Sequence, residues 1–103
     1  MDGKMNGWMG KVLRVNLTEG SVREEPADQE TWRKYIGGRG YGAKVLYDET
    51  GPETGALSPE NLLVFATGPF TGTKAPTPSR YSMTTKSPLT GTFLDSYAGG
   101  TFP

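Results

Sequence analysis

The stretch TGPFTGTKAPTPSRYSMTTKSPLTGTFLDSYAGG, residues 67–100, decides the fold of this chain. It contains the string Pro-x-Thr-Gly-Thr twice, at residues 69–73 and 88–92. Proline presets φ and the following Thr-Gly closes a tight turn, so each string predicts the end of a β-hairpin. Residues 81–85, between the two turns, alternate small polar side chains with Met83, and this alternation predicts a strand.

The same stretch contains groups suited to an anion. We expect both turns, the glycine pair Gly99–Gly100 and the one arginine of the stretch, Arg80, to lie on a common surface. Outward-pointing backbone N–H groups and a guanidinium suit a phosphate. The alternative is that the turns are plain hairpin ends and that Arg80 is a solvated charge.

Outward toward the N-terminus, residues 9–17 alternate with a period of two. Leu13, Val15 and Leu17 share one side of this pattern, which predicts a half-buried strand. A turn at residues 18–20 and a return strand at 21–25 complete a hairpin. Glu24 and Glu25 then point to opposite faces, so they cannot act as an acid–base pair.

Two short helices are expected next. Asp28 suits the N-cap of a helix over residues 29–36, and Gly37–Gly38 ends it. Its apolar side chains are expected to face the sheet; they are Trp32, Tyr35 and Ile36. A second helix is expected at 41–48, a buried strand at 62–66 and another strand at 92–95. The sum is an α+β domain, mainly antiparallel β-sheet with two short helices.

The glycine-rich run 38–42, Gly-Arg-Gly-Tyr-Gly, resembles a dinucleotide loop only superficially. It follows a helix rather than a strand, which excludes that interpretation. Two interpretations remain. The run joins one helix end to the next helix start, or its glycines let the backbone approach a large planar cofactor.

Composition limits the function classes. The 103 residues suit one small domain, with residues 1–6 frayed, and 11 basic residues balance 11 acidic ones, which gives no reason to expect nucleic acid. The sequence has no cysteine and no histidine, which excludes disulfides, thiol catalysis and a cysteine-ligated iron–sulfur cluster in this chain. The longest apolar run, 62–66, is too short to cross a membrane. No apolar signal core follows residues 1–4, so a cytoplasmic protein is expected.

Short motifs that follow one another in order resemble the N-terminal domain of the tungsten-containing aldehyde ferredoxin oxidoreductases, over about residues 7–102. They are residues 7–18, 35–40, 57–61, 65–69, 80–81, 85–92, and 95–96 with 98–100. The resemblance implies that residues 7–103 form a truncated copy of that domain, on which a pair of pterins lies.

The resemblance also implies roles for single residues. In the similar enzymes an arginine at the place of Arg80 contacts a phosphate of the tungsten–pterin cofactor. Ala98, Gly99 and Gly100 would lie against the pterins. Tyr97 stands where the family commonly has asparagine, whose backbone carbonyl lies near a magnesium ion that bridges the phosphates. Tyr97 keeps that carbonyl, but its ring is larger and its side-chain amide is lost.

Two further residues of the stretch have less specific expectations. Asp95 is expected to cap a turn. Lys86 either extends a positive patch toward phosphates or is solvated.

In the family, a tungsten atom held by two molybdopterins (tungstopterin, with magnesium) oxidises aldehydes to carboxylic acids. Electrons leave through a [4Fe–4S] cluster to ferredoxin, and that cluster belongs to later domains. The chain is therefore expected to be an N-terminal fragment that is inactive alone. It is either truncated or acts beside a separately encoded remainder of the enzyme, with ferredoxin as a further partner. The alternative is a stand-alone α+β binding module without redox activity. Neither nucleic acid nor a membrane is an expected partner, and an unpaired sheet edge permits a homodimer.

Overall fold

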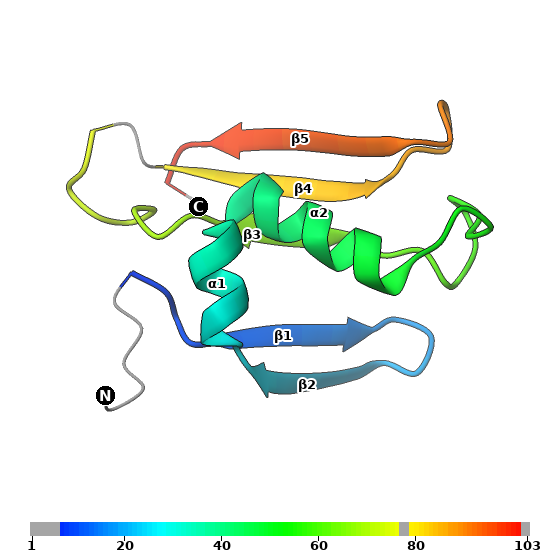
Figure 1. Ribbon diagram of the computed structural model, residues 1–103, viewed down its shortest axis with the longest axis horizontal. Helices are drawn as coiled ribbons and strands as arrows, with labels where there is room; N and C mark the ends of the chain where they lie inside the picture. The colour runs from blue at the N-terminus through cyan, green and yellow to red at the C-terminus, as the bar shows by residue number, and fades with distance from the viewer. Residues whose placement is uncertain (1–6, 77–78, 102–103) are drawn as a thin grey trace.

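The computed structural model describes residues 7–76 and 79–101 (Figure 1). Its elements, in chain order, are β1 (Lys11–Asn16), β2 (Ser21–Pro26), α1 (Gln29–Tyr35), α2 (Gly38–Glu49), β3 (Val64–Thr67), β4 (Arg80–Lys86) and β5 (Phe93–Gly99). The strands form two antiparallel sheets, β1–β2 and β3–β4–β5. The predicted α+β class is confirmed. The expected fraying of residues 1–6 lies outside the described residues.

The β1–β2 hairpin forms as predicted. Its register runs from Lys11 opposite Pro26 to Asn16 opposite Ser21. The connecting turn closes because the Asn16 side-chain oxygen accepts hydrogen bonds from the N–H groups of Thr18 and Glu19, at 3.0 and 3.2 Å. Gly20 takes φ 68°, the left-handed conformation that favours glycine.

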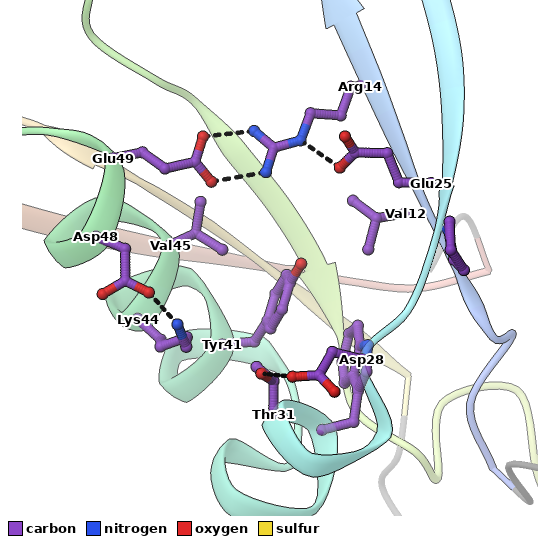
Figure 2. Close-up of a pocket in the computed structure, with 12 residues that line it drawn as sticks. Val12, Arg14, Glu25, Asp28, Thr31, Tyr41, Lys44, Val45, Asp48 and Glu49 are labelled. Atoms are coloured by element: carbon purple, nitrogen blue, oxygen red, sulfur yellow. Dashed lines mark hydrogen bonds and ion pairs between the residues drawn. The ribbon is translucent and has the colours of Figure 1, made fainter.

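The face of β1 that points into the molecule is not the predicted one. Val12 and Arg14 are half-buried, whereas Leu13 and Val15 are 62% and 54% exposed. The period of two is correct, but the side chains of the even positions contact the helices (Figure 2). Arg14 determines this orientation because its guanidinium pairs with Glu49 of α2.

Helix α1 begins after Asp28, as predicted, and the Thr31 hydroxyl donates to the Asp28 carboxylate at 2.6 Å. This bond lowers the pKa of Asp28. The predicted packing of α1 on the sheet is wrong. None of its residues is fully buried, Ile36 is 58% exposed, and the Trp32 ring stacks on Tyr41 of α2 with 4.3 Å between ring centroids. Aromatic stacking between the helices thus replaces packing on the sheet.

Helix α2 begins at Gly38, three residues earlier than predicted, and packs on the three-stranded sheet (Figure 1). A Cβ on Gly42 would lie 2.5 Å from Thr84 Oγ1, and a Cβ on Gly37 would lie 2.5 Å from Thr67 O. These glycines therefore bring the helix backbone close to the sheet. The interpretation of residues 38–42 as a helix start is confirmed.

The three-stranded sheet pairs β3 with β4 and β4 with β5 in sequence order. Its helix-covered face contains the buried side chains Ala66, Ser82 and Thr84. Residues 62–66 were expected to be buried throughout, but Leu63 and Phe65 are 59% and 60% exposed because only one face of β3 is covered. Neither helix of the described part of the chain is long and apolar enough to cross a membrane.

Candidate functional site

One end of the three-stranded sheet gathers most of the predicted site. β3 ends at Thr67, β4 begins at Arg80 and β5 ends at Gly99, so these strand ends meet there with the loop residues that follow β3 (Figure 1). We call this region the loop end: residues 68–73, Arg80, Gly99 and Gly100. The Thr71 hydroxyl donates to the Arg80 carbonyl at 3.3 Å, which ties the first Pro-x-Thr-Gly-Thr turn to β4.

The second Pro-x-Thr-Gly-Thr turn lies at the opposite end of the sheet. It joins β4 to β5, and there the N–H of Ser87 donates to Thr92 O at 2.8 Å. The prediction that both turns share one surface is therefore wrong. In an antiparallel sheet whose strands follow in sequence order, consecutive turns lie at alternate ends.

Arg80 and the segment 97–100 meet as predicted. Arg80 lies opposite Gly99, and Ser82 lies opposite Tyr97. Side chains two residues apart share a sheet face, so Arg80 and Tyr97 are both on the face that α2 covers. Ala98 points to the other face. Tyr97 and Ala98 belong to β5, which extends past the predicted limit of residue 95 because β4 pairs with it over its whole length.

The two glycines differ in their surroundings. A Cβ on Gly99 would lie 3.3 Å from Ser79 O and 4.0 Å from Arg80 Cγ. Gly100 has φ 97°, and no atom of the described residues lies within 4 Å of such a Cβ. Gly99 therefore lets the chain pack closely beside Arg80, while Gly100 leaves open space.

Charge at this site comes from Arg80 and Arg39. Among the described residues, no carboxylate forms an ion pair with Arg80. Arg39, in the first turn of α2, lies 3.7 Å from the carboxylate of Asp95 (Nη1 to Oδ2). The expectation that Asp95 caps a turn is wrong, since it lies within β5 and pairs with this arginine. A hydrogen bond with Asp95 raises the pKa of the Tyr97 hydroxyl, and the nearby positive charge of Arg39 opposes that effect.

Sequence reasoning missed Arg39 as a site residue. Its setting between Gly38 and Gly40 drew attention to the glycines. The available signal was a guanidinium at the start of a helix. No local pattern indicated that Arg39 would lie beside Asp95, because the two residues are 56 positions apart in the sequence.

The backbone carbonyl of Tyr97 is directed away from β4. Paired residues of an antiparallel ladder alternate between those that exchange backbone hydrogen bonds and those that do not. Ser87 and Thr92 form a hydrogen-bonded pair, and Ser82–Tyr97 lies five pairs further along the same ladder. The Ser82–Tyr97 pair therefore exchanges no backbone hydrogen bonds. β5 is an edge strand, so this carbonyl faces the open edge. The predicted magnesium contact through it stays a prediction.

Lys86 does not belong to the site. It lies near the far end of β4, and its ammonium group donates to the carbonyls of Pro52 and Thr54, at 3.1 and 2.6 Å. Both earlier interpretations, a phosphate patch and a solvated lysine, are wrong. Lys86 instead attaches the loop after α2 to the sheet.

The donor set at the loop end fits a phosphate rather than a protein-ligated metal. The Arg80 guanidinium forms no ion pair with a carboxylate of the described residues, and the described residues leave space beside Gly100. No group of three or more potential metal-ligating side chains exists in the described part of the chain. A phosphorylated cofactor is compatible with these residues, whereas a cluster held by cysteines is not, because the sequence has none.

A concave region lies away from the loop end, between the hairpin and the helices, with a volume of about 190 Å³ (Figure 2). Its charged side chains pair with one another, except that Asp28 accepts a hydrogen bond from the Thr31 hydroxyl. The Arg14 guanidinium contacts Glu49 at 2.5 and 2.7 Å and Glu25 at 2.8 Å, and Lys44 pairs with Asp48. This region is therefore a joint that holds the hairpin on the helices, rather than a ligand site. We call Arg14, Glu25 and Glu49 the Arg14 joint.

Comparison with known proteins gives consistent results. The family described as "Aldehyde ferredoxin oxidoreductase, N-terminal domain" matches residues 12–103. Tungsten-containing aldehyde ferredoxin oxidoreductases of Pyrococcus abyssi and Pyrococcus horikoshii are 51% and 50% identical over 98 residues, 95% of this chain and 16% of each relative. The chain thus spans about a sixth of the length of these curated relatives.

A solved structure agrees with the fold. The active-site complex BamBC of benzoyl coenzyme A reductase, in complex with 1,5-dienoyl-CoA, is 40% identical with a TM-score of 0.86. The match covers 89% of this chain and 14% of that one. The chain therefore belongs to the aldehyde ferredoxin oxidoreductase family and corresponds to its N-terminal domain.

Proposed function

We propose that this chain is the N-terminal part of the cofactor base of a tungsten-containing aldehyde ferredoxin oxidoreductase. One observation carries the proposal. Arg80 lies opposite Gly99, on the same face as Tyr97, and no described carboxylate neutralises it. An Arg fork with this freedom is suited to a phosphate, which it binds through two parallel hydrogen bonds.

In this proposal the residues of the chain bind and orient the cofactor. Arg80 holds a phosphate of a pterin, Gly99 and Gly100 keep side chains out of the way of the rings, and the Tyr97 carbonyl is available to magnesium. The bound tungstopterin would supply the two-electron oxidation of an aldehyde. The [4Fe–4S] cluster and the contact with ferredoxin would belong to polypeptide outside these 103 residues. A cytoplasmic location stays a prediction.

Arg39 adds to this proposal. It lies at the same face, and its pairing distance to Asp95 is long for an ion pair with direct hydrogen bonds. We expect it to be a weaker second cation for the cofactor, since Asp95 offsets part of its charge.

The test is the cofactor content of the protein purified from its native host, with any polypeptide that accompanies it. Tungsten is measured by mass spectrometry of the metal, and pterin by the fluorescence of its oxidised form. Arg80→Gln should lower both by about tenfold, because a hydrogen bond to a charged group contributes roughly 1.5–3 kcal/mol. The control is Arg23→Gln, an arginine of the hairpin that is 71% exposed.

Equal tungsten content in Arg80→Gln and in the unsubstituted protein would refute the assigned role of Arg80. Absence of both tungsten and pterin from the unsubstituted native assembly would refute the cofactor base and favour a binding module without redox activity.

A further inference from the structure

The face of the three-stranded sheet that points away from α2 is apolar, and no helix or further strand of the described residues packs on it. We call it the back face: Phe65, Tyr81, Met83 and Leu94. The strand registers place these side chains on one side, because Phe65 lies opposite Met83 and Leu94 lies opposite Thr85. The Phe65 and Tyr81 rings contact each other, with 6.1 Å between centroids. Phe65 is 60% exposed and Leu94 is 38% exposed.

The back face has no charged side chain at its described strand positions. The remaining described strand positions on this side of the sheet have small, neutral side chains: Thr67, Thr85, Ser96 and Ala98. By contrast, the exposed face of the hairpin has the Lys11–Glu24 ion pair beside Leu13. The lack of cations argues against a nucleic acid or an anionic membrane surface as the partner of the back face.

We infer that the back face is covered by an apolar layer of the polypeptide that lies outside the matched region in the relatives. The chain spans only 16% of those relatives, so most of their polypeptide is available to supply this layer. Whether that polypeptide continues from this chain or forms a separate subunit, the contact is the same. The inference does not depend on the cofactor, because the back face is opposite the side chains of Arg80 and Tyr97.

Two substitutions test it in the native assembly. The sequence has no cysteine, so Phe65→Cys places a single thiol of this chain on the back face. Leu57→Cys is the control, since Leu57 is 89% exposed and lies in the loop after α2. Maleimide labelling of each thiol is compared before and after unfolding in urea and read by peptide mass spectrometry. Labelling of Phe65→Cys should be at least about tenfold slower in the folded assembly, because thiol reactivity follows exposure. Labelling of Leu57→Cys should change little.

The identity of the covering polypeptide comes from photo-cross-linking. Phe65 is replaced by p-benzoylphenylalanine, which keeps an aromatic ring, and cross-linked peptides are mapped by mass spectrometry. Leu94→Cys, labelled in the same way as Phe65→Cys, is used if either Phe65 variant fails to accumulate.

Cross-links to family sequence outside residues 1–103 support the inference. Cross-links to a second copy of residues 1–103 overturn it and make the back face a dimer interface. Fast labelling of the back-face thiol in the assembly also overturns it. The tungsten content of these variants is measured in parallel, so that failure of this inference is distinguished from failure of the proposed cofactor role.

Discussion

Arg14 shows how one side chain can join two parts of the molecule. Its guanidinium contacts Glu25 of the hairpin and Glu49 of α2, and the three side chains are about one-third exposed. The two glutamates raise the pKa of Arg14, Glu49 more strongly. Arg14→Met should weaken the attachment of the hairpin by about 1 kcal/mol, the upper range for partly exposed ion pairs.

Hydrogen exchange of the β1 and β2 amides measures the effect of Arg14→Met. Exchange in the hairpin should accelerate, while exchange in β4 should not change. The control is Lys11→Met, whose ion pair with Glu24 is longer, at 3.3 Å, and more exposed. If both variants exchange alike, the Arg14 joint contributes no more than an ordinary surface ion pair.

The same joint predicts a dependence on pH. The hydrogen bond from Arg14 lowers the pKa of Glu25 below its ordinary value of 4.5. A carboxylate whose pKa is lowered in the folded state stabilises that state above its unfolded pKa, and the contribution is lost as pH falls through the lowered value. Hairpin exchange, corrected for the intrinsic effect of pH, should therefore accelerate below about pH 4.5.

Glu25→Gln provides the comparison for this pH effect. It should already exchange faster at pH 6, and its corrected rate should change less between pH 6 and pH 3. An unchanged pH profile in this variant would assign the acid sensitivity to other carboxylates, of which Asp28 also has a lowered pKa.

At the scale of the element, α2 depends on glycine to approach the sheet. Gly42→Ala would place a methyl group 2.5 Å from Thr84 Oγ1 and 2.8 Å from Thr84 Cβ. Alanine favours a helix by about 1 kcal/mol over glycine. Thr84 is fully buried and cannot move aside, so the clash should dominate and cost about 1–3 kcal/mol net.

Thermal unfolding of the native assembly measures the effect of Gly42→Ala. The matched control is Gly68→Ala, where a Cβ meets no atom within 4 Å. The double variant Gly42→Ala/Thr84→Ala should recover part of the loss, because it removes the nearest atom, Thr84 Oγ1, although Thr84 Cβ remains. An unaltered melting temperature in the single variant would mean that α2 can shift over the sheet at little cost.

Local patterns predicted most elements but not how they are placed. The Pro-x-Thr-Gly-Thr strings correctly predicted turns. The two turns lie at opposite ends of the sheet because of the strand order, and turn residues carry no information about that order. The alternation in β1 defined two faces, yet the choice between them depends on the pairing of Arg14 with Glu49, 35 residues away. Long-range contacts of this kind leave no periodic signal.

At the scale of the whole molecule, the candidate site is built from two kinds of contact. Arg80, Tyr97 and Gly99 came together because β4 and β5 are neighbours joined by a short turn, so their register could be anticipated. Arg39 joined them only through the packing of α2, which depends on Gly37 and Gly42. Contacts between the neighbouring strands β4 and β5 were thus predictable from the sequence, whereas contacts between α2 and the sheet were not.

The small core of the whole chain leads to a final prediction. Leu46 and Ala66, each 7% exposed, are the only buried hydrophobic residues among those described. The 103 residues expressed alone should therefore unfold at a lower temperature than the same residues in the native assembly. Binding that favours the folded state raises the melting temperature, by about 4–8 °C for each kcal/mol in a domain of this size.

Fluorescence of Trp8 and Trp32 reports this unfolding, since both rings lie at the junction of the N-terminal segment and the helices. A difference of about 10 °C or more would correspond to roughly 2 kcal/mol supplied by the covering polypeptide. Phe65→Ser should lower the melting temperature of the assembly but not that of the free chain, because the Phe65 ring is already 60% exposed in the free chain. The difference between the two melting temperatures should therefore become smaller. Equal melting temperatures for the free and the assembled chain would contradict this prediction. They would show that the buried apolar residues, the Arg14 joint and the stack of Trp32 on Tyr41 stabilise the fold without the covering polypeptide.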